Sequence, residues 1–170
     1  MNIILINFYN GTGCDNCGRT LNEILAWNDT ELEETHDFIQ FVFPLKDPSR
    51  FNPDAPLLDS ETIQEFRSNQ TIKDNVCKSL VRIRKFYDIS NPCNPHPVWM
   101  TPLNHNYMRL TRILKSLCLL GFEADAQILL YDLNAYYKYN RASIGDTTMR
   151  FWNQAVKVKN EYPYKRDDLQ

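Results

Sequence analysis

The chain reads His105-Asn106-Tyr107-Met108-Arg109-Leu110-Thr111-Arg112-Ile113-Leu114-Lys115-Ser116-Leu117 in its most strongly patterned stretch. At 3.6 residues per turn, four apolar side chains fall on one arc: Leu110, Ile113, Leu114 and Leu117. The polar side chains fall on the opposite side, with Lys115 at its margin: His105, Arg109, Arg112 and Ser116. The pattern predicts a central helix that Asn104 can cap and that ends at Gly121.

The basic side of this helix has two interpretations. It can bind an anion, because Arg109 and Arg112 lie one turn apart and can converge on one carboxylate or phosphate. His105 lies near the helix N-terminus, where the macrodipole also favours an anion. In the structural interpretation these cations form a solvated face, or they are held internally by acidic side chains. The candidate acidic partners are Asp37, Glu34 and Asp47.

A second segment can supply the other wall of an anion pocket. His36 and Gln40 are one helical turn apart, although a hydrogen-bonded structural role is the simpler interpretation of His36 alone. The predicted ligand-binding residues are His36, Gln40, His105, Arg109, Arg112 and Lys115. A peptide carboxylate, a phosphate or a nucleotide satisfies such a set, and the sequence does not separate them.

The composition is that of a globular protein. The chain has 170 residues, of which 43% are hydrophobic and 12% aromatic, enough to bury a core. The net charge of -2 gives no general attraction to nucleic acid or to an anionic membrane, so we expect neither partner. The apolar run at residues 3–6 is too short for a signal peptide or a membrane span. The five cysteines, an odd number, predict free thiols in a reducing, cytoplasmic setting.

The first part of the chain predicts one extended segment and two helices. The β-branched run at residues 3–6 predicts a short strand or a buried extended arm. Thr20 with Glu23, and Thr30 with Glu33, have the pattern of capping boxes, so each pair is expected to begin a helix. The second helix is expected to continue along an apolar stripe and to end before a proline. The stripe consists of Leu32, Thr35, Ile39 and Val42, and the proline is Pro44.

Two proline-rich loops separate the helices that follow. These loops cover residues 44–58 and about 91–102. Between them, one helix is expected to begin at Asp59 or Ser60. Another is expected over residues 72–87, where an apolar residue recurs every three or four positions.

The end of the chain predicts two more helices. One covers about residues 123–139, and Gly145 separates it from a last helix that Asp146 can cap. The tail, residues 162–170, is expected to fray. The predicted fold is therefore all-α, a single compact bundle of about six helices with a short extended N-terminal segment. We expect it to form one domain over residues 1–170.

Two segments carry a resemblance to a known family. The first is His36-Asp37-Phe38-Ile39-Gln40-Phe41-Val42-Phe43-Pro44-Leu45-Lys46-Asp47-Pro48, and the second is the stretch quoted above. Together they resemble the conserved N-terminal region of the opioid growth factor receptor family. A weaker likeness extends from Asn7-Phe8-Tyr9 through Phe86-Tyr87-Asp88-Ile89 to the last helix, in the same order.

The resemblance implies a soluble helical domain that is unrelated to the seven-helix opioid receptors. It implies a family linked to binding an enkephalin-type peptide and to growth control at the nucleus. It establishes no catalytic residue. Since the chain has neither the repeat-rich tail of the animal receptor nor a basic localisation cluster, we expect a stand-alone domain.

The segment Cys14-Asp15-Asn16-Cys17 offers a different interpretation. An apolar run, a glycine loop, a Cys-x-x-Cys pair and a helix are the local layout of a thioredoxin-like redox site. Such a fold needs further strands, which the rest of the chain does not predict. A zinc site needs two more ligands, for which Cys93 and His96 are candidates. We therefore predict no metal site, and treat Cys14 and Cys17 as weak candidates.

The sequence lacks the common catalytic and nucleotide-binding motifs. A P-loop, a dinucleotide fingerprint, a nucleophile elbow and an HExxH motif are all missing. We therefore predict a binding module rather than an enzyme, without a cofactor. The predicted ligand is a short peptide or another anionic small molecule. One alternative is a phosphate- or nucleotide-binding protein, and the other is a thiol–disulfide or zinc protein that uses Cys14 and Cys17.

Overall fold

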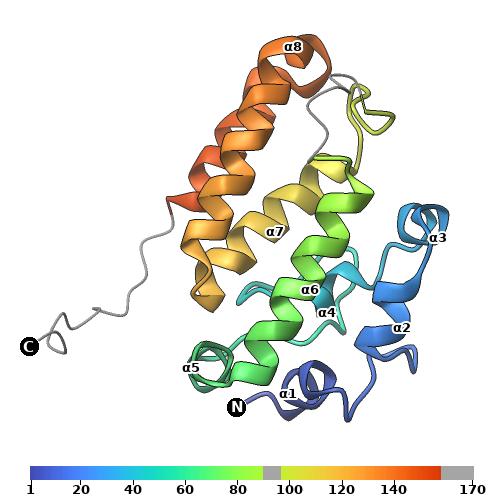
Figure 1. The fold of residues 1–170 in the computed structure, drawn as a ribbon, viewed down its shortest axis with the longest axis vertical. Helices are drawn as coiled ribbons and strands as arrows, with labels where there is room; N and C mark the ends of the chain where they lie inside the picture. Colours follow the sequence, from blue (N-terminus) through green and yellow to red (C-terminus); the bar gives the residue numbers. More distant parts are fainter. Residues whose placement is uncertain (90–96, 158–170) are drawn as a thin grey trace, which may run out of the picture.

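The computed structural model describes residues 1–89 and 97–157. The described residues form eight helices and no strand, so the all-α prediction is confirmed, whereas the count of about six helices is not. Figure 1 shows α6 (Gln70–Phe86), α7 (Asn106–Leu120) and α8 (Glu123–Val156) as the long elements of the bundle, with the short helices α2 (Leu21–Ala26) and α3 (Asp29–Glu34) to the right of α6. The most extensive packing joins α7 to α8, while α6 contacts α2, α1 (Ile3–Asn10) and α5 (Ser60–Ser68).

The N-terminal segment is a helix, so the predicted strand or extended arm is wrong. α1 (Ile3–Asn10) begins at Asn2, whose side chain accepts a hydrogen bond from the Leu5 N–H. Its buried side chains include Leu5 and Phe8, while Ile3 and Ile4 are half exposed. A run of four apolar residues does not by itself distinguish a strand from a buried helix, and the Asn2 cap decides for the helix.

The next segment forms three short helices where two were expected. The capping box of Thr20 and Glu23 begins α2 (Leu21–Ala26), as predicted. The second box was placed wrongly, because Asn28 and Glu31 form it and begin α3 (Asp29–Glu34). The expected continuation of this helix is also wrong. α3 ends at Glu34 and a separate single turn, α4 (Ile39–Val42), follows.

The two helices after the first proline-rich loop match the prediction. Asp59 caps α5 (Ser60–Ser68) by accepting a hydrogen bond of 2.7 Å from the Thr62 N–H. α6 buries the apolar stripe that its sequence predicts, through Ile72, Val76, Leu80 and Ile83.

α7 has the predicted core face. Leu110, Ile113, Leu114 and Leu117 are fully buried. The Asn104 side chain accepts a hydrogen bond from the N–H of Asn106, the first residue of the helix. At the other end Gly121 has a φ of 90°, which favours glycine, and it closes the helix as predicted.

α8 reverses direction within its length. Its backbone leaves the helical conformation at Asn140 and at Gly145, where φ is 78° and ψ is 149°. Figure 1 shows the two limbs of α8 running back along each other. The second limb returns Trp152 to α7, where its indole N–H donates to the Tyr107 carbonyl at 3.1 Å. The predicted break at Gly145 is therefore confirmed. Asp146 accepts hydrogen bonds from Arg141 and Tyr137.

Three predictions of the sequence fall wholly or partly outside the described ranges: the zinc-ligand candidates Cys93 and His96, the first half of the loop at about residues 91–102, and the tail at residues 162–170. Within the described ranges, none of the helices combines the length and the apolar character that crossing a membrane requires.

Candidate functional site

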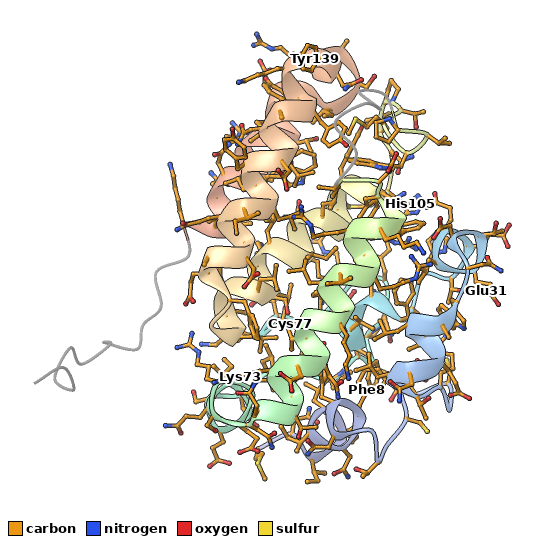
Figure 2. The ribbon with its side chains drawn as sticks, in the orientation of Figure 1. Phe8, Glu31, Lys73, Cys77, His105 and Tyr139 are labelled. Atoms are coloured by element: carbon orange, nitrogen blue, oxygen red, sulfur yellow. The ribbon has the colours of Figure 1, made fainter. Side chains whose placement is uncertain are left out.

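All six predicted ligand-binding residues line one cavity of about 310 Å³. α7 supplies Arg109, Arg112 and Lys115, and His105 directly precedes this helix. The segment around α4 supplies His36 and Gln40. Five residues of the following loop close the remaining side: Leu45, Pro48, Ser49, Arg50 and Phe51. In Figure 2, His105 lies on the side of the bundle where α3 is found. The structure thus brings together residues that are almost 80 positions apart in the sequence.

The cavity is lined by positive and apolar side chains. Its basic residues are Arg50, Arg109, Arg112 and Lys115, accompanied by His36 and His105. Its apolar residues are Ile39, Leu45, Pro48, Phe51 and Met108. None of the described residues that line it is acidic. This combination suits an anion that also carries an apolar part.

Arg109 is bound internally. It is only 6% exposed, and its guanidinium donates to the backbone carbonyls of Leu32 at 2.9 Å and of Thr35 at 2.8 Å. A longer bond of 3.3 Å reaches the Glu33 carbonyl. These acceptors lie in and just after the last turn of α3, where helix carbonyls lack intrahelical partners. Arg109 therefore binds the C-terminal end of α3. It is held internally, but by carbonyl oxygens rather than by the acidic side chains that the structural interpretation named.

The acidic residues expected to pair with Arg109 and Arg112 are not their partners in the described structure. Asp37 instead binds Arg19, at 2.9 Å, and the Cys17 thiol. Arg109 forms a long ion pair with Glu33, whose Oε2 atom lies 4.0 Å from the Arg109 Nη1 atom. The arginine is therefore held chiefly by main-chain oxygens, which no side-chain pattern in a sequence reveals.

Arg112 is a cation without a counter-ion among the described residues. It is half buried, and its guanidinium donates one hydrogen bond, of 3.1 Å, to the Phe43 carbonyl. Burial lowers the pKa of Arg112 from its ordinary value. Lys115, one turn further on, is also half buried, and none of the described residues forms an ion pair or hydrogen bond with it. These two cations form the open part of the basic lining.

The two histidines stand next to each other at one side of the cavity. Their ring centres are 4.9 Å apart. The Nδ1 atom of His36 is hydrogen-bonded to the Glu34 carbonyl at 2.7 Å, in line with a structural role. His105 Nε2 is buried without a hydrogen-bond partner among the described residues, and a Glu33 carboxylate oxygen lies 3.5 Å away. Burial, followed by the charge of Arg109, lowers the pKa of His105, which favours the neutral ring.

Gln40 has a buried side-chain oxygen without a hydrogen-bond partner among the described residues. Its side chain is 4% exposed, and this oxygen is Oε1. Gln40 lies in α4, but His36 precedes that helix. The two residues therefore share a cavity wall, although the expectation that they share one helix is wrong.

Ser116, expected on the polar face of α7, is buried. Its hydroxyl donates to the Pro44 carbonyl at 2.9 Å. The sequence argument also missed the contribution of the loop, because residues 44–58 gave only a pattern of prolines. The one available signal was the pair Arg50-Phe51, a cation next to an aromatic residue within that loop.

The Cys-x-x-Cys segment does not form a recognisable site. Cys14 and Cys17 are both exposed free thiols. A hydrogen bond to Asp37 raises the pKa of Cys17, which is the opposite of what a reactive thiolate needs. The described residues include no cluster of metal-ligating side chains, and they form no sheet of the thioredoxin kind.

Comparison with known proteins identifies the family. The model of the opioid growth factor receptor conserved region matches residues 3–96. The chain belongs to the opioid growth factor receptor family. The resemblance noted in the sequence is thereby confirmed, and α1 to α6 lie within the matched region.

Curated members of the family cover most of this chain. The opioid growth factor receptor of Mus musculus is 30% identical over 174 residues, which cover 92% of this chain and 27% of the relative. The receptor of Rattus norvegicus is also 30% identical, over 92% of this chain and 30% of its own length. The human receptor is 32% identical over 62% of the chain. The chain thus spans under a third of these relatives, and no solved structure matches it.

Proposed function

We propose that this domain binds a small anionic ligand with an apolar part, such as a short peptide, in the cavity between α4 and α7. The observation that carries the proposal is Arg112, a partly buried guanidinium with no counter-ion among the described residues. Withdrawing a charge from water is costly unless an opposite charge or hydrogen bonds compensate it. A ligand carboxylate or phosphate supplies that compensation.

The other residues of the cavity have separable roles. Lys115 and Arg50 add positive charge next to Arg112, while Arg109 holds the end of α3. The apolar wall, which includes Leu45 and Met108, takes the uncharged part of the ligand. A peptide provides both parts in one molecule. The relatives named opioid growth factor receptor support a peptide, since their name describes a receptor for a growth factor.

The surroundings of two hydroxyl groups in the cavity lining support binding rather than catalysis. The Ser49 hydroxyl accepts hydrogen bonds from the loop N–H groups of Phe51 and Asn52. The Thr111 hydroxyl donates to the Tyr107 carbonyl. Among the described residues neither hydroxyl is hydrogen-bonded to a His, Asp or Glu side chain, whereas a nucleophile needs a hydrogen bond to a general base.

Replacing Arg112 tests the proposal. Arg112→Ala and the control Arg150→Ala, at an exposed position on α8, remove the same charge from different places. Two probes, N-acetyl-leucyl-leucine and phenyl phosphate, each combine an anion with an apolar group. By calorimetry, we expect Arg112→Ala to weaken the binding of at least one probe on the order of ten- to a hundredfold, because a charge-assisted hydrogen bond is lost. Equal binding by both variants contradicts the proposal.

A further inference from the structure

Building on the proposed function, we infer that the cavity recognises the free C-terminus of a peptide. In this arrangement Arg112 and Lys115 bind the terminal carboxylate, and Gln40 Oε1 accepts a hydrogen bond from the N–H of the last residue. The proposed function requires only an anion with an apolar part. This inference further requires a hydrogen-bond donor close to that anion.

Gln40 is the residue whose side-chain oxygen lacks a hydrogen-bond donor. It lines the cavity, it is 96% buried, and its Oε1 atom has no partner among the described residues. A buried acceptor without a donor is rare in proteins because it has lost its water and gained nothing in exchange. A ligand N–H that reaches this oxygen restores the missing bond.

The need for a donor separates the classes of ligand. A fully ionised phosphate or an isolated carboxylate offers acceptors alone, which Gln40 Oε1 cannot use. The last residue of a peptide carries an N–H and a carboxylate on the same Cα atom, so donor and anion are joined at a fixed short distance. His105 Nε2, the second buried atom of this cavity without a hydrogen bond, can pair with the carbonyl of the preceding residue.

The apolar lining determines which kind of side chain is favoured at the C-terminal residue of the peptide. Ile39, Leu45 and Met108 line the same cavity, so an aliphatic C-terminal residue is favoured. The volume of about 310 Å³ lies at the lower end of the range for small-ligand sites. One or two residues of the peptide therefore enter the cavity, and the rest remains outside.

Three probes that differ by single groups test this inference on the full chain. The reference is N-acetyl-leucyl-leucine with its free carboxylate. Its C-terminal amide removes the charge, and its depsipeptide analogue replaces the last N–H by an ester oxygen while keeping the carboxylate. In calorimetry we expect the free acid to bind at least tenfold more tightly than the amide, and about three- to tenfold more tightly than the ester.

The variant Gln40→Met assigns the N–H preference to Gln40. Methionine has a similar length and no comparable acceptor, so the buried site keeps its packing. In this variant the acid and the ester are expected to bind equally, while the preference for the acid over the amide remains. Gln40→Leu serves as a second variant, and a thermal melt confirms the fold of each. A merely structural role of Gln40 lowers the affinity for acid and ester alike and leaves their ratio unchanged, which overturns the inference.

The outcomes also separate this inference from the proposed function. If phenyl phosphate binds in an Arg112-dependent way, and the peptide acid binds no better than its amide or ester, recognition of the C-terminus is overturned while anion binding stands. If neither phenyl phosphate nor the free acid depends on Arg112, the proposed function fails as well.

Discussion

Arg109 and Arg112 lie one turn apart on the same helix, yet their surroundings assign them different roles. Arg109 is surrounded by main-chain carbonyls that satisfy its guanidinium. Arg112 meets a single carbonyl and leaves the rest of its donors available. Two identical side chains at helical spacing therefore serve as one structural group and one candidate ligand-binding group.

Arg109→Ala is expected to destabilise the fold. The change leaves the carbonyls of Leu32 and Thr35 without their donor in a buried place, so the free energy of unfolding should fall by about 2–4 kcal/mol. Arg112→Ala should change it by less than about 1 kcal/mol, since one partly exposed hydrogen bond is lost. Urea denaturation of both variants measures the difference. Equal stability of the two variants would show that the carbonyl contacts of Arg109 contribute little.

At the residue scale, the sequence predicted which side chains meet but not what each of them binds. The spacing of His105, Arg109, Arg112 and Lys115 placed them near one face, and the structure brings them into one cavity. The carbonyl acceptors of Arg109 could not be foreseen. They are backbone oxygens 74 to 77 positions away in the chain, and any residue type provides the same oxygen. A further acceptor, the Asn106 side-chain oxygen at 3.2 Å, lies on the same helix.

At the element scale, the polar row of α7 holds the ends of two short helices. Arg109 binds the carbonyls at the end of α3, while Arg112 and Ser116 bind those of Phe43 and Pro44, directly after α4. Helix C-termini carry unsatisfied carbonyls and a partial negative charge, so cationic donors are favoured there. This explains how a helix of four residues, α4, is held in place and keeps Gln40 at the cavity.

The beginning of α3 provides a test of the corrected helix boundary. Asn28→Ala removes the side-chain oxygen that accepts the Glu31 N–H, at 2.9 Å, so the free energy of unfolding should fall by about 1 kcal/mol. Thr30→Ala is the matched control, because Thr30 lies inside the helix and makes no cap. Thermal or urea denaturation compares the two. A larger loss for Thr30→Ala would restore the boundary that the sequence favoured.

The sequence predicted elements well where a cap or a long apolar period was present. A cap marks the beginning of α5, a long apolar period marks α6, and α7 has both. The errors at α1 and α3 have local causes. The apolar run of α1 is too short to show a period, and the patterns Asn28-x-x-Glu31 and Thr30-x-x-Glu33 compete two residues apart.

At the scale of the whole molecule, charge is distributed unevenly. The chain has a net charge of -2, but the lining of the cavity contains four cationic residues and, among the described residues, no carboxylate. Attraction of an anion therefore depends on the local field of the cavity rather than on the overall charge. Net charge alone gave no indication of this site.

The reversal of α8 at Gly145 joins the two limbs that pack with α7. Gly145 has a φ of 78° and a ψ of 149°, a conformation that other residues adopt only under strain. A Cβ atom added there meets no heavy atom within 4 Å, so Gly145→Ala tests the strain alone. We expect a loss of about 1–3 kcal/mol of unfolding free energy in urea denaturation. Thr147→Ala, at an exposed position, should change it by less than about 0.5 kcal/mol. Similar values for both variants would argue against a strained turn.

The returning limb of α8 has a consequence for how the cavity can adapt. α7 is packed against α8 along its apolar arc and is bonded to residues 32–44 along its polar row. Because α7 is fixed on two sides, it cannot shift to accommodate a larger ligand. The opposite wall includes Arg50 and Phe51, which are exposed in the loop between α4 and α5. Changes of preference among related domains are therefore expected to arise by substitution and altered length in this loop, while α7 stays nearly constant.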